Sequence, residues 1–296
     1  MKLSENDTKL FYKLMNNLLC YVNKKVKIIK NRKFESHKDF IDNPISFEDV
    51  ANLQDELFSN ISIIDKVVDK NPYSFNQEEI SIIKSWKNFI CDNFFIIKHL
   101  KKYTTIFQEK TNNESYVYWI KWLYDSIGDI VDEKQMVKMT LLPFKEHIIY
   151  SWIITWGNMY FWGWIMSWIM EMYNESKLKY WIIESIPFDP KKGLKNDEEL
   201  LIEYLKTEKN EEKYWDEIIS LKYKNKKLEN LFHQRRNRLY SKFYKKEYKI
   251  NSVTWFFAIY NTLPVAIAKN KKDLEKRISV FVEKTKINQV YIFQIK

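Results

Sequence analysis

The feature that most constrains the fold is a change in the spacing of apolar residues near residue 92. Before it, apolar side chains recur every three or four positions, as Phe11, Leu14, Leu18 and Val22 do, and this spacing is typical of amphipathic helices. After it, Ile, Val, Thr, Tyr and Phe dominate short runs between polar residues, which is typical of strands. The chain is therefore predicted to be an α+β protein.

The local patterns divide the chain further. Ser46 followed by Asp49, and Asn76 followed by Glu79, are capping signatures, so helices are expected to begin after Ser46 and Asn76. The predicted segments are an N-terminal helical bundle over 1–92, a small central antiparallel β unit over 93–186, a Pro- and Gly-containing linker over 187–198, charged helices over 199–246 and a ββαβ unit over 247–296. Within the β unit the expected strands are 94–107, 116–124, 136–142 and 147–154.

The charge balance indicates an anionic partner. Lys+Arg number 49 against 39 Asp+Glu, which gives a net charge of +10. A basic surface favours nucleic acid or acidic lipid. The alternative is that the gene comes from an AT-rich genome, which encodes lysine-rich proteins whatever their function.

Cysteine usage predicts a reducing compartment. Cys20 and Cys91 are the two cysteines, and their spacing fits neither a disulfide framework nor a C-x-x-C motif. The first ten residues carry charge of both signs and lack the apolar core of a signal peptide. The expected location is the cytoplasm.

One stretch reads as a membrane-span candidate. From Ile148 to Met170 there is no charged residue, and about 20 apolar residues suffice to cross a bilayer as a helix. Tryptophans are spread through the run, however, whereas in membrane spans they gather at the two interfaces. This composition disfavours a membrane span.

Catalytic and metal-binding signatures are missing. The four histidines His37, His99, His147 and His233 have no ligand-like spacing, so no metal site is predicted. Glycine-rich phosphate loops, dinucleotide fingerprints and nucleophile elbows are also lacking, and no cofactor is predicted. The densest acidic cluster has two readings, a Mg²⁺ or acid/base site and ordinary turn chemistry; it consists of Asp125, Asp129, Asp132 and Glu133.

The first basic candidate lies within the first pair of expected strands. Lys98, Lys101 and Lys102 precede Tyr103, so positive charge flanks an aromatic ring, as in a platform for single-stranded nucleic acid. Lysines that protect an edge strand from pairing explain the same residues.

The second basic candidate is a run within the charged helical region. It consists of Arg235, Arg236, Arg238, Lys242, Lys245 and Lys246. On a helix, Arg235, Arg238, Lys242 and Lys245 share a face with a spacing suited to successive phosphates. The alternative is a solvated helix face with no partner.

Three classes of function remain open. A nucleic-acid-binding or regulatory module is favoured by the charge and by the second basic candidate. A protein-interaction module without chemistry and a metal-dependent enzyme without a recognisable motif are the alternatives.

The centre of the chain carries a distinctive motif. It consists of Leu141, Leu142, Pro143, Phe144, Lys145, Ile148, Ile149 and Tyr150, with Ser85-Trp86-Lys87 and 95–102 upstream. With these residues the chain resembles an uncharacterised prokaryotic family that has a segment like LLPFKGxIIYDG. No function of that family is known, so the resemblance implies an order of elements and no mechanism. This chain departs from the pattern at Glu146 and Trp152, where the family has glycine, and at Ser151, where it has aspartate.

Glycine is scarce and tryptophan abundant. The chain has 4 Gly and 11 Trp, whereas average usage of about 7% predicts roughly 20 glycines. Some bacterial lineages read the codon UGA as glycine. If such a gene is translated with the genetic code that reads UGA as tryptophan, Trp appears in the sequence wherever the protein has those glycines. The positions predicted to be glycines in the living protein are Trp119, Trp122, Trp152, Trp162, Trp164 and Trp181. Trp86 and Trp215 lie on helical apolar faces and are expected to be genuine; the alternative at the other positions is a true Trp-rich groove or membrane surface.

Overall fold

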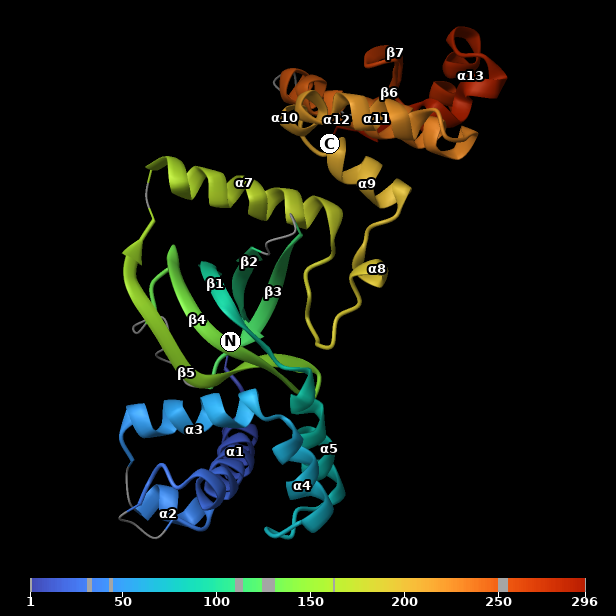
Figure 1. Ribbon diagram of the computed structural model, residues 1–296. Helices are drawn as coiled ribbons and strands as arrows, with labels where there is room; N and C mark the ends of the chain where they lie inside the picture. The colour runs from blue at the N-terminus through green and yellow to red at the C-terminus, as the bar shows by residue number, and fades with distance from the viewer. Residues whose placement is uncertain are drawn as a thin grey trace. The chain divides into compact units, whose positions relative to one another are not determined.

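The chain forms two compact units, Met1–Gly193 and Leu194–Lys296, in a computed structural model. The residues described are 2–30, 34–42, 45–109, 114–123, 131–161, 163–249 and 255–295. Helices and sheets are both present, so the predicted α+β class is confirmed (Figure 1). The division between the units falls inside the stretch 187–198 that the sequence predicts as a linker.

Unit 1 begins with one long helix followed by shorter ones. They are α1 (Glu5–Val26), α2 (His37–Asp42), α3 (Phe47–Ser59), α4 (Ser62–Lys70) and α5 (Gln77–Ser85), and a 3-10 turn, Trp86–Asn88, follows. The side chain of Ser46 accepts the N–H of Asp49 at the start of α3, and Asn76 with Glu79 forms a full capping box at the start of α5. Both starts lie where the capping signatures predict them.

Five strands of unit 1 close into a barrel. They are β1 (Ile90–His99), β2 (Thr104–Glu109), β3 (Ser115–Lys121), β4 (Gln135–Phe144) and β5 (His147–Tyr160), in the order β1-β2-β3-β5-β4. β3 and β5 pair in parallel, with Ile120 opposite Ile148, while the other pairs are antiparallel.

The barrel differs from the expected antiparallel unit in two ways. The segment 94–107 is divided between β1 and β2, and the parallel β3–β5 pair closes the sheet. Apolar alternation reports which residues face the core but not which strand lies beside which, so neither the closure nor the parallel pair was visible in the sequence.

The helices and the barrel share one hydrophobic core. Phe11 of α1 is fully buried and packs edge-on against Trp86 and Phe144, with ring centroids 5.7 and 6.2 Å apart. The helical region 1–92 and the β region are thus parts of one folded unit.

The uncharged run Ile148–Met170 is divided between β5 and α7 (Gly163–Lys179), which crosses one end of the barrel in Figure 1. Ile169 of α7 is buried against Phe95, Phe107 and Val117. Among the residues described, no helix has the length and apolar character needed to cross a membrane.

Unit 2 combines short helices, one long helix and a small sheet. After α8 (Pro190–Gly193), which ends unit 1, the α-helices and strands of unit 2 are α9 (Asp197–Tyr204), α10 (Glu208–Lys213), α11 (Trp215–Lys222), α12 (Lys226–Lys249), β6 (Phe256–Tyr260), β7 (Leu263–Ala268), α13 (Lys271–Phe281) and β8 (Tyr291–Gln294), with a 3-10 helix, Lys284–Gln289, before β8. The sheet order is β7-β6-β8, with antiparallel pairs. The long helix α12 contacts α9 and α11 as well as β6 and β8.

Candidate nucleic-acid interface

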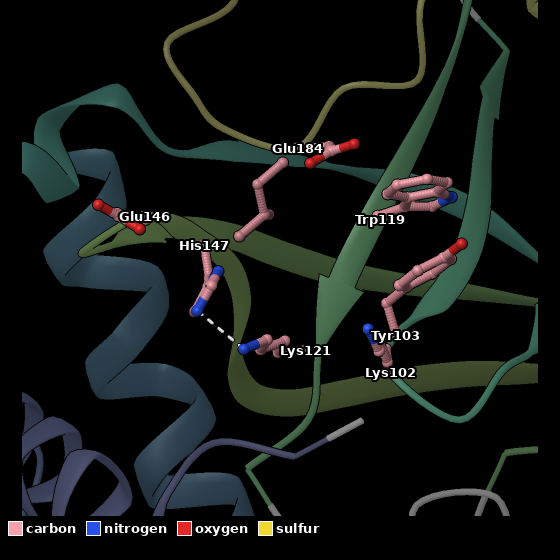
Figure 2. Close-up of a pocket in the computed structure, with 8 residues that line it drawn as sticks. Lys102, Tyr103, Trp119, Lys121, Glu146, His147 and Glu184 are labelled. Atoms are coloured by element: carbon pink, nitrogen blue, oxygen red, sulfur yellow. Dashed lines mark hydrogen bonds between the residues drawn. The ribbon is translucent and has the colours of Figure 1, made fainter.

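Two aromatic rings meet on the outside of the barrel. Tyr103 precedes β2 and Trp119 lies in β3, and the pairing of Thr104 with Ile120 and of Thr105 with Trp119 brings the two rings side by side. Their centroids are 3.9 Å apart and the ring planes differ by 22°, so they stack (Figure 2). Both residues are half-buried, which leaves part of each ring accessible.

The stacked rings form one wall of a cavity of about 540 Å³. Lys102 and Lys121 line it beside the rings, and Glu146, His147 and Glu184 complete it. We call Lys102, Tyr103, Trp119, Lys121 and His147 the stacking surface. Three parts of the unit build it, namely the β1–β2 loop, the end of β3 and the start of β5.

His147 holds Lys121 against the wall of the cavity. The Nζ atom of Lys121 lies 2.8 Å from Nε2 of His147. Burial lowers the pKa of His147, and the neighbouring ammonium of Lys121 lowers it further. The neutral imidazole therefore accepts a hydrogen bond from Lys121, and the ammonium keeps its other two N–H groups for a ligand.

The first predicted basic candidate contributes one lysine to this surface. Lys98, Lys101 and Lys102 are all exposed, and Lys102 lines the cavity itself. Lys98 lies beyond Phe95, the last residue of β1 that pairs with β4, so protection of a strand edge also fits it.

The residues of the second candidate lie in four different environments on α12. Arg235, Arg238 and Lys242 line a hollow beside α9. The Nε atom of Arg236 is 2.6 Å from Oε1 of the buried Glu211. Lys245 lies over the ring of Phe293, with its Nζ 4.6 Å from the centroid, and Lys246 is exposed.

The family-like motif joins the helices to the barrel. Phe144 and Tyr150 are buried, as is Ile149, and Pro143 lies in β4. Lys145 occupies the β4–β5 loop, with its Nζ 2.6 Å from Oδ1 of Asp7 at the start of α1. The hydrogen bond between them raises the pKa of Lys145 and lowers that of Asp7. These contacts indicate a structural role for the motif.

Sequence reasoning missed Trp119, Lys121, His147 and Glu184 as parts of a binding surface. Trp119 and Lys121 alternate along one strand, and this spacing puts them on the same side of the sheet. That signal was available, whereas the approach of His147 depends on the β3–β5 pairing.

No three His, Cys, Asp or Glu side chains come together as a metal site within the described part of the chain. Of the predicted acidic cluster, Asp125 and Asp129 lie outside the described residues. The Glu133 carboxylate accepts a hydrogen bond of 2.9 Å from the backbone N–H of His99. The backbone N–H of Asp132 donates a hydrogen bond to Oε1 of Gln135. For Glu133 this contact supports a local structural role.

Comparison with known proteins gives no match, whether to a family model, to a curated protein or to a solved structure.

Proposed function

We propose that this protein binds single-stranded nucleic acid through the stacking surface. The observation that carries the proposal is the stacked pair Tyr103 and Trp119 beside Lys102 and Lys121 in one cavity. Every base has a flat face that stacks on such rings, and each stacked base contributes about 1–3 kcal/mol. The lysine ammonium groups neutralise the adjoining phosphates.

The two carboxylates of the cavity favour a base over a bare phosphate. Glu146 and Glu184 offset much of the charge of Lys102 and Lys121 within the cavity. Carboxylates accept hydrogen bonds from the exocyclic amines of bases, as they do from cytosine N4. Stacking requires an open base face, which a duplex does not offer, so a single strand is the expected ligand.

The barrel topology agrees with this function by analogy. A five-stranded Greek-key barrel closed in the order β1-β2-β3-β5-β4 has the strand order of the OB-fold. OB-folds bind oligonucleotides and oligosaccharides on the face of strands 2 and 3 and on the loops that join strands 1 to 2 and 4 to 5. Tyr103, Trp119 and Glu146 occupy those positions here. A shared topology alone does not carry a function, and the side chains remain the argument.

The test is binding of a fluorescent mixed-sequence oligonucleotide to the full chain, single-stranded and duplex, followed by anisotropy. Tyr103→Ala is expected to weaken single-strand binding by about 5- to 150-fold, the equivalent of about 1–3 kcal/mol. Tyr223→Ala removes a 73% exposed tyrosine of unit 2 and is the matched control. If Tyr103→Ala binds as tightly as Tyr223→Ala, the stacking surface is not the interface.

We propose further that residue 152 is glycine in the living protein. Trp152 has φ 59°, a left-handed backbone that bulky side chains rarely adopt. It lies in a bulge, because between the pairs Met139–Ile154 and Leu141–Tyr150 strand β4 has one residue and β5 has three. Glycine is the usual residue at left-handed positions in bulges, and the resembling family has glycine there.

The side chain of Trp152 supports the same proposal. Its indole Nε1 is buried and has no hydrogen-bond partner within the described residues, which costs about 1–3 kcal/mol. The bulge itself is held without it, because Gln54 Nε2 donates to the Ser151 carbonyl at 2.8 Å. A glycine at 152 would keep the bulge and remove both costs.

The structure gives different degrees of support for glycine at the other tryptophan positions. Trp164 and Trp181 are 80% and 52% exposed, which is unusual for tryptophan and compatible with glycine. Trp122 is fully buried and donates its Nε1–H to Thr104, so its surroundings give no argument for glycine. Trp162 lies outside the described residues.

The codons test this second proposal directly. UGA at position 152, and a glycine mass in the peptide from the native organism, are expected; UGG there, or a tryptophan mass, would contradict it. If Trp119 proves to be glycine as well, the covered face of Tyr103 becomes free, so Tyr103 carries the interface in either case.

A further inference from the structure

A small hollow between α9 and α12 gathers four cationic side chains. Arg235, Arg238 and Lys242 project from α12, and Lys206 follows the end of α9. The hollow measures about 210 Å³.

The charge in this hollow is poorly neutralised. Glu203 is the carboxylate that lines it, and it lies 3.2 Å from Lys206 and 4.0 Å from Lys195. Within the described part of the chain, neither Arg235 nor Arg238 forms an ion pair. Like charges three or four residues apart on a helix destabilise it, so an anion bound among them would relieve the repulsion.

The fold holds one of these cations, Lys242, in place. The Nζ atom of Lys242 donates to the backbone carbonyl of Lys206 at 3.2 Å, which ties α12 to the end of α9 beside the hollow. Leu205 and Leu239 are buried there and form an apolar wall. Because this wall keeps water away from one side of the hollow, the attraction between the cations and a bound anion is stronger there than in open solvent.

We propose that this hollow is a phosphate-binding site. Arginine guanidinium groups match phosphate oxygens in a two-pronged geometry, and Arg235 and Arg238 supply two of them. The volume lies below the roughly 300 Å³ at which pockets for whole small molecules begin, so the site suits a phosphate group and excludes a complete nucleotide. The phosphate can belong to a nucleic-acid backbone or to a free phosphate compound.

The proposal does not rest on the stacking surface, since every residue involved belongs to unit 2. The experiment is isothermal titration calorimetry of the full chain with inorganic phosphate and with an unphosphorylated single-stranded oligonucleotide. The double variant Arg235→Gln/Arg238→Gln removes the guanidinium groups, and Lys246→Gln, at an exposed lysine of the same helix, is the matched control.

Inorganic phosphate is expected to bind the native chain. Its affinity for the double variant is expected to be about tenfold or more lower, while its affinity for the control variant stays within about twofold of the native value. A parallel loss for the unphosphorylated oligonucleotide identifies the nucleic-acid backbone as the source; a loss confined to inorganic phosphate identifies free phosphate compounds. If the double variant binds both ligands as tightly as the native chain, the proposed site is refuted. If the double variant loses its far-UV circular dichroism and so does not fold, Lys242→Gln takes its place, and unchanged affinity in Lys242→Gln refutes the site. Tyr103→Ala should leave phosphate binding intact, which separates this outcome from that of the stacking surface.

Discussion

The barrel of unit 1 and helix α12 of unit 2 place aromatic rings beside positive charge in opposite ways. At the barrel, Tyr103 and Trp119 stack on each other while Lys102 and Lys121 stand beside them. On α12, the guanidinium of Arg236 lies over the Trp215 ring, 5.3 Å from its centroid.

The difference decides what each region can bind. Rings that stack only on each other keep an outer face for a base. Rings covered by the protein's own cations are already satisfied by cation–π attraction, and they serve to hold the fold. Arg235 and Arg238 of α12 line a hollow whose described lining residues include no aromatic ring, so they suit a phosphate rather than a base. A sequence in which aromatic and basic residues alternate can therefore form either a surface that stacks on bases or a surface that binds phosphate.

Arg236→Ala is expected to have the largest effect on the free energy of unfolding. It leaves Glu211, whose side chain is 7% exposed, without its partner and uncovers the Trp215 ring. The free energy of unfolding is expected to fall by about 2–3 kcal/mol, less than for a fully buried pair because Arg236 is one-third exposed. Urea unfolding checks it, with Arg238→Ala expected within about 0.5 kcal/mol of the native chain. Equal losses in the two variants would show that Arg236 has no special structural role.

The next prediction compares Trp152, whose buried Nε1 has no hydrogen-bond partner within the described residues, with Trp215. Trp152→Gly is expected to raise the free energy of unfolding by about 1–2 kcal/mol, because it relieves a left-handed backbone. Trp215→Gly, at a ring covered by Arg236, should lower it. Thermal unfolding of both variants gives the two signs. A loss of stability in Trp152→Gly would indicate that tryptophan belongs in the bulge.

Salt dependence sharpens the contrast between the two surfaces. Stacking releases no counterions, so Tyr103→Ala should lower oligonucleotide affinity and leave the slope of log K against log salt unchanged. Arg235→Gln/Arg238→Gln should reduce that slope by about 1–2 if the hollow contacts the backbone. Affinity measured at several salt concentrations distinguishes the variants. Identical slopes in both would remove the distinction between a base site and a phosphate site.

The smallest expected effect is on the pH dependence of unit 1. The folded pKa of His147 lies below its ordinary value of 6.5, so its contribution to stability is present above pH 6.5 and is lost as the pH falls through the folded pKa. His147→Gln should flatten this part of the stability curve. Burial also lowers the pKa of His37 and His233, so the difference between the native chain and the variant isolates His147. Parallel curves would contradict a neutral His147.

The local features of this protein follow from short stretches of its sequence. Capping at Ser46 and Asn76 and the apolar spacing of α1 involve neighbours within a few residues, so they are legible without the fold. The exposed lysines of the β1–β2 loop and the basic run of α12 were visible for the same reason. The scarcity of glycine beside abundant tryptophan predicts glycine at six tryptophan positions; this stays a prediction, and among those of the six that the structure describes, Trp152 is the one with a left-handed backbone.

Which of these residues come together depends on the packing of distant segments. The parallel pairing of β3 with β5 brings His147 to Lys121, 26 positions away in the chain. The packing of α12 assigns Arg236 to Glu211 and leaves Arg235 and Arg238 facing a hollow, although all three arginines look alike in sequence. Helical spacing fixes the angle between side chains, but the charges and rings that meet them come from distant segments, which no local pattern encodes.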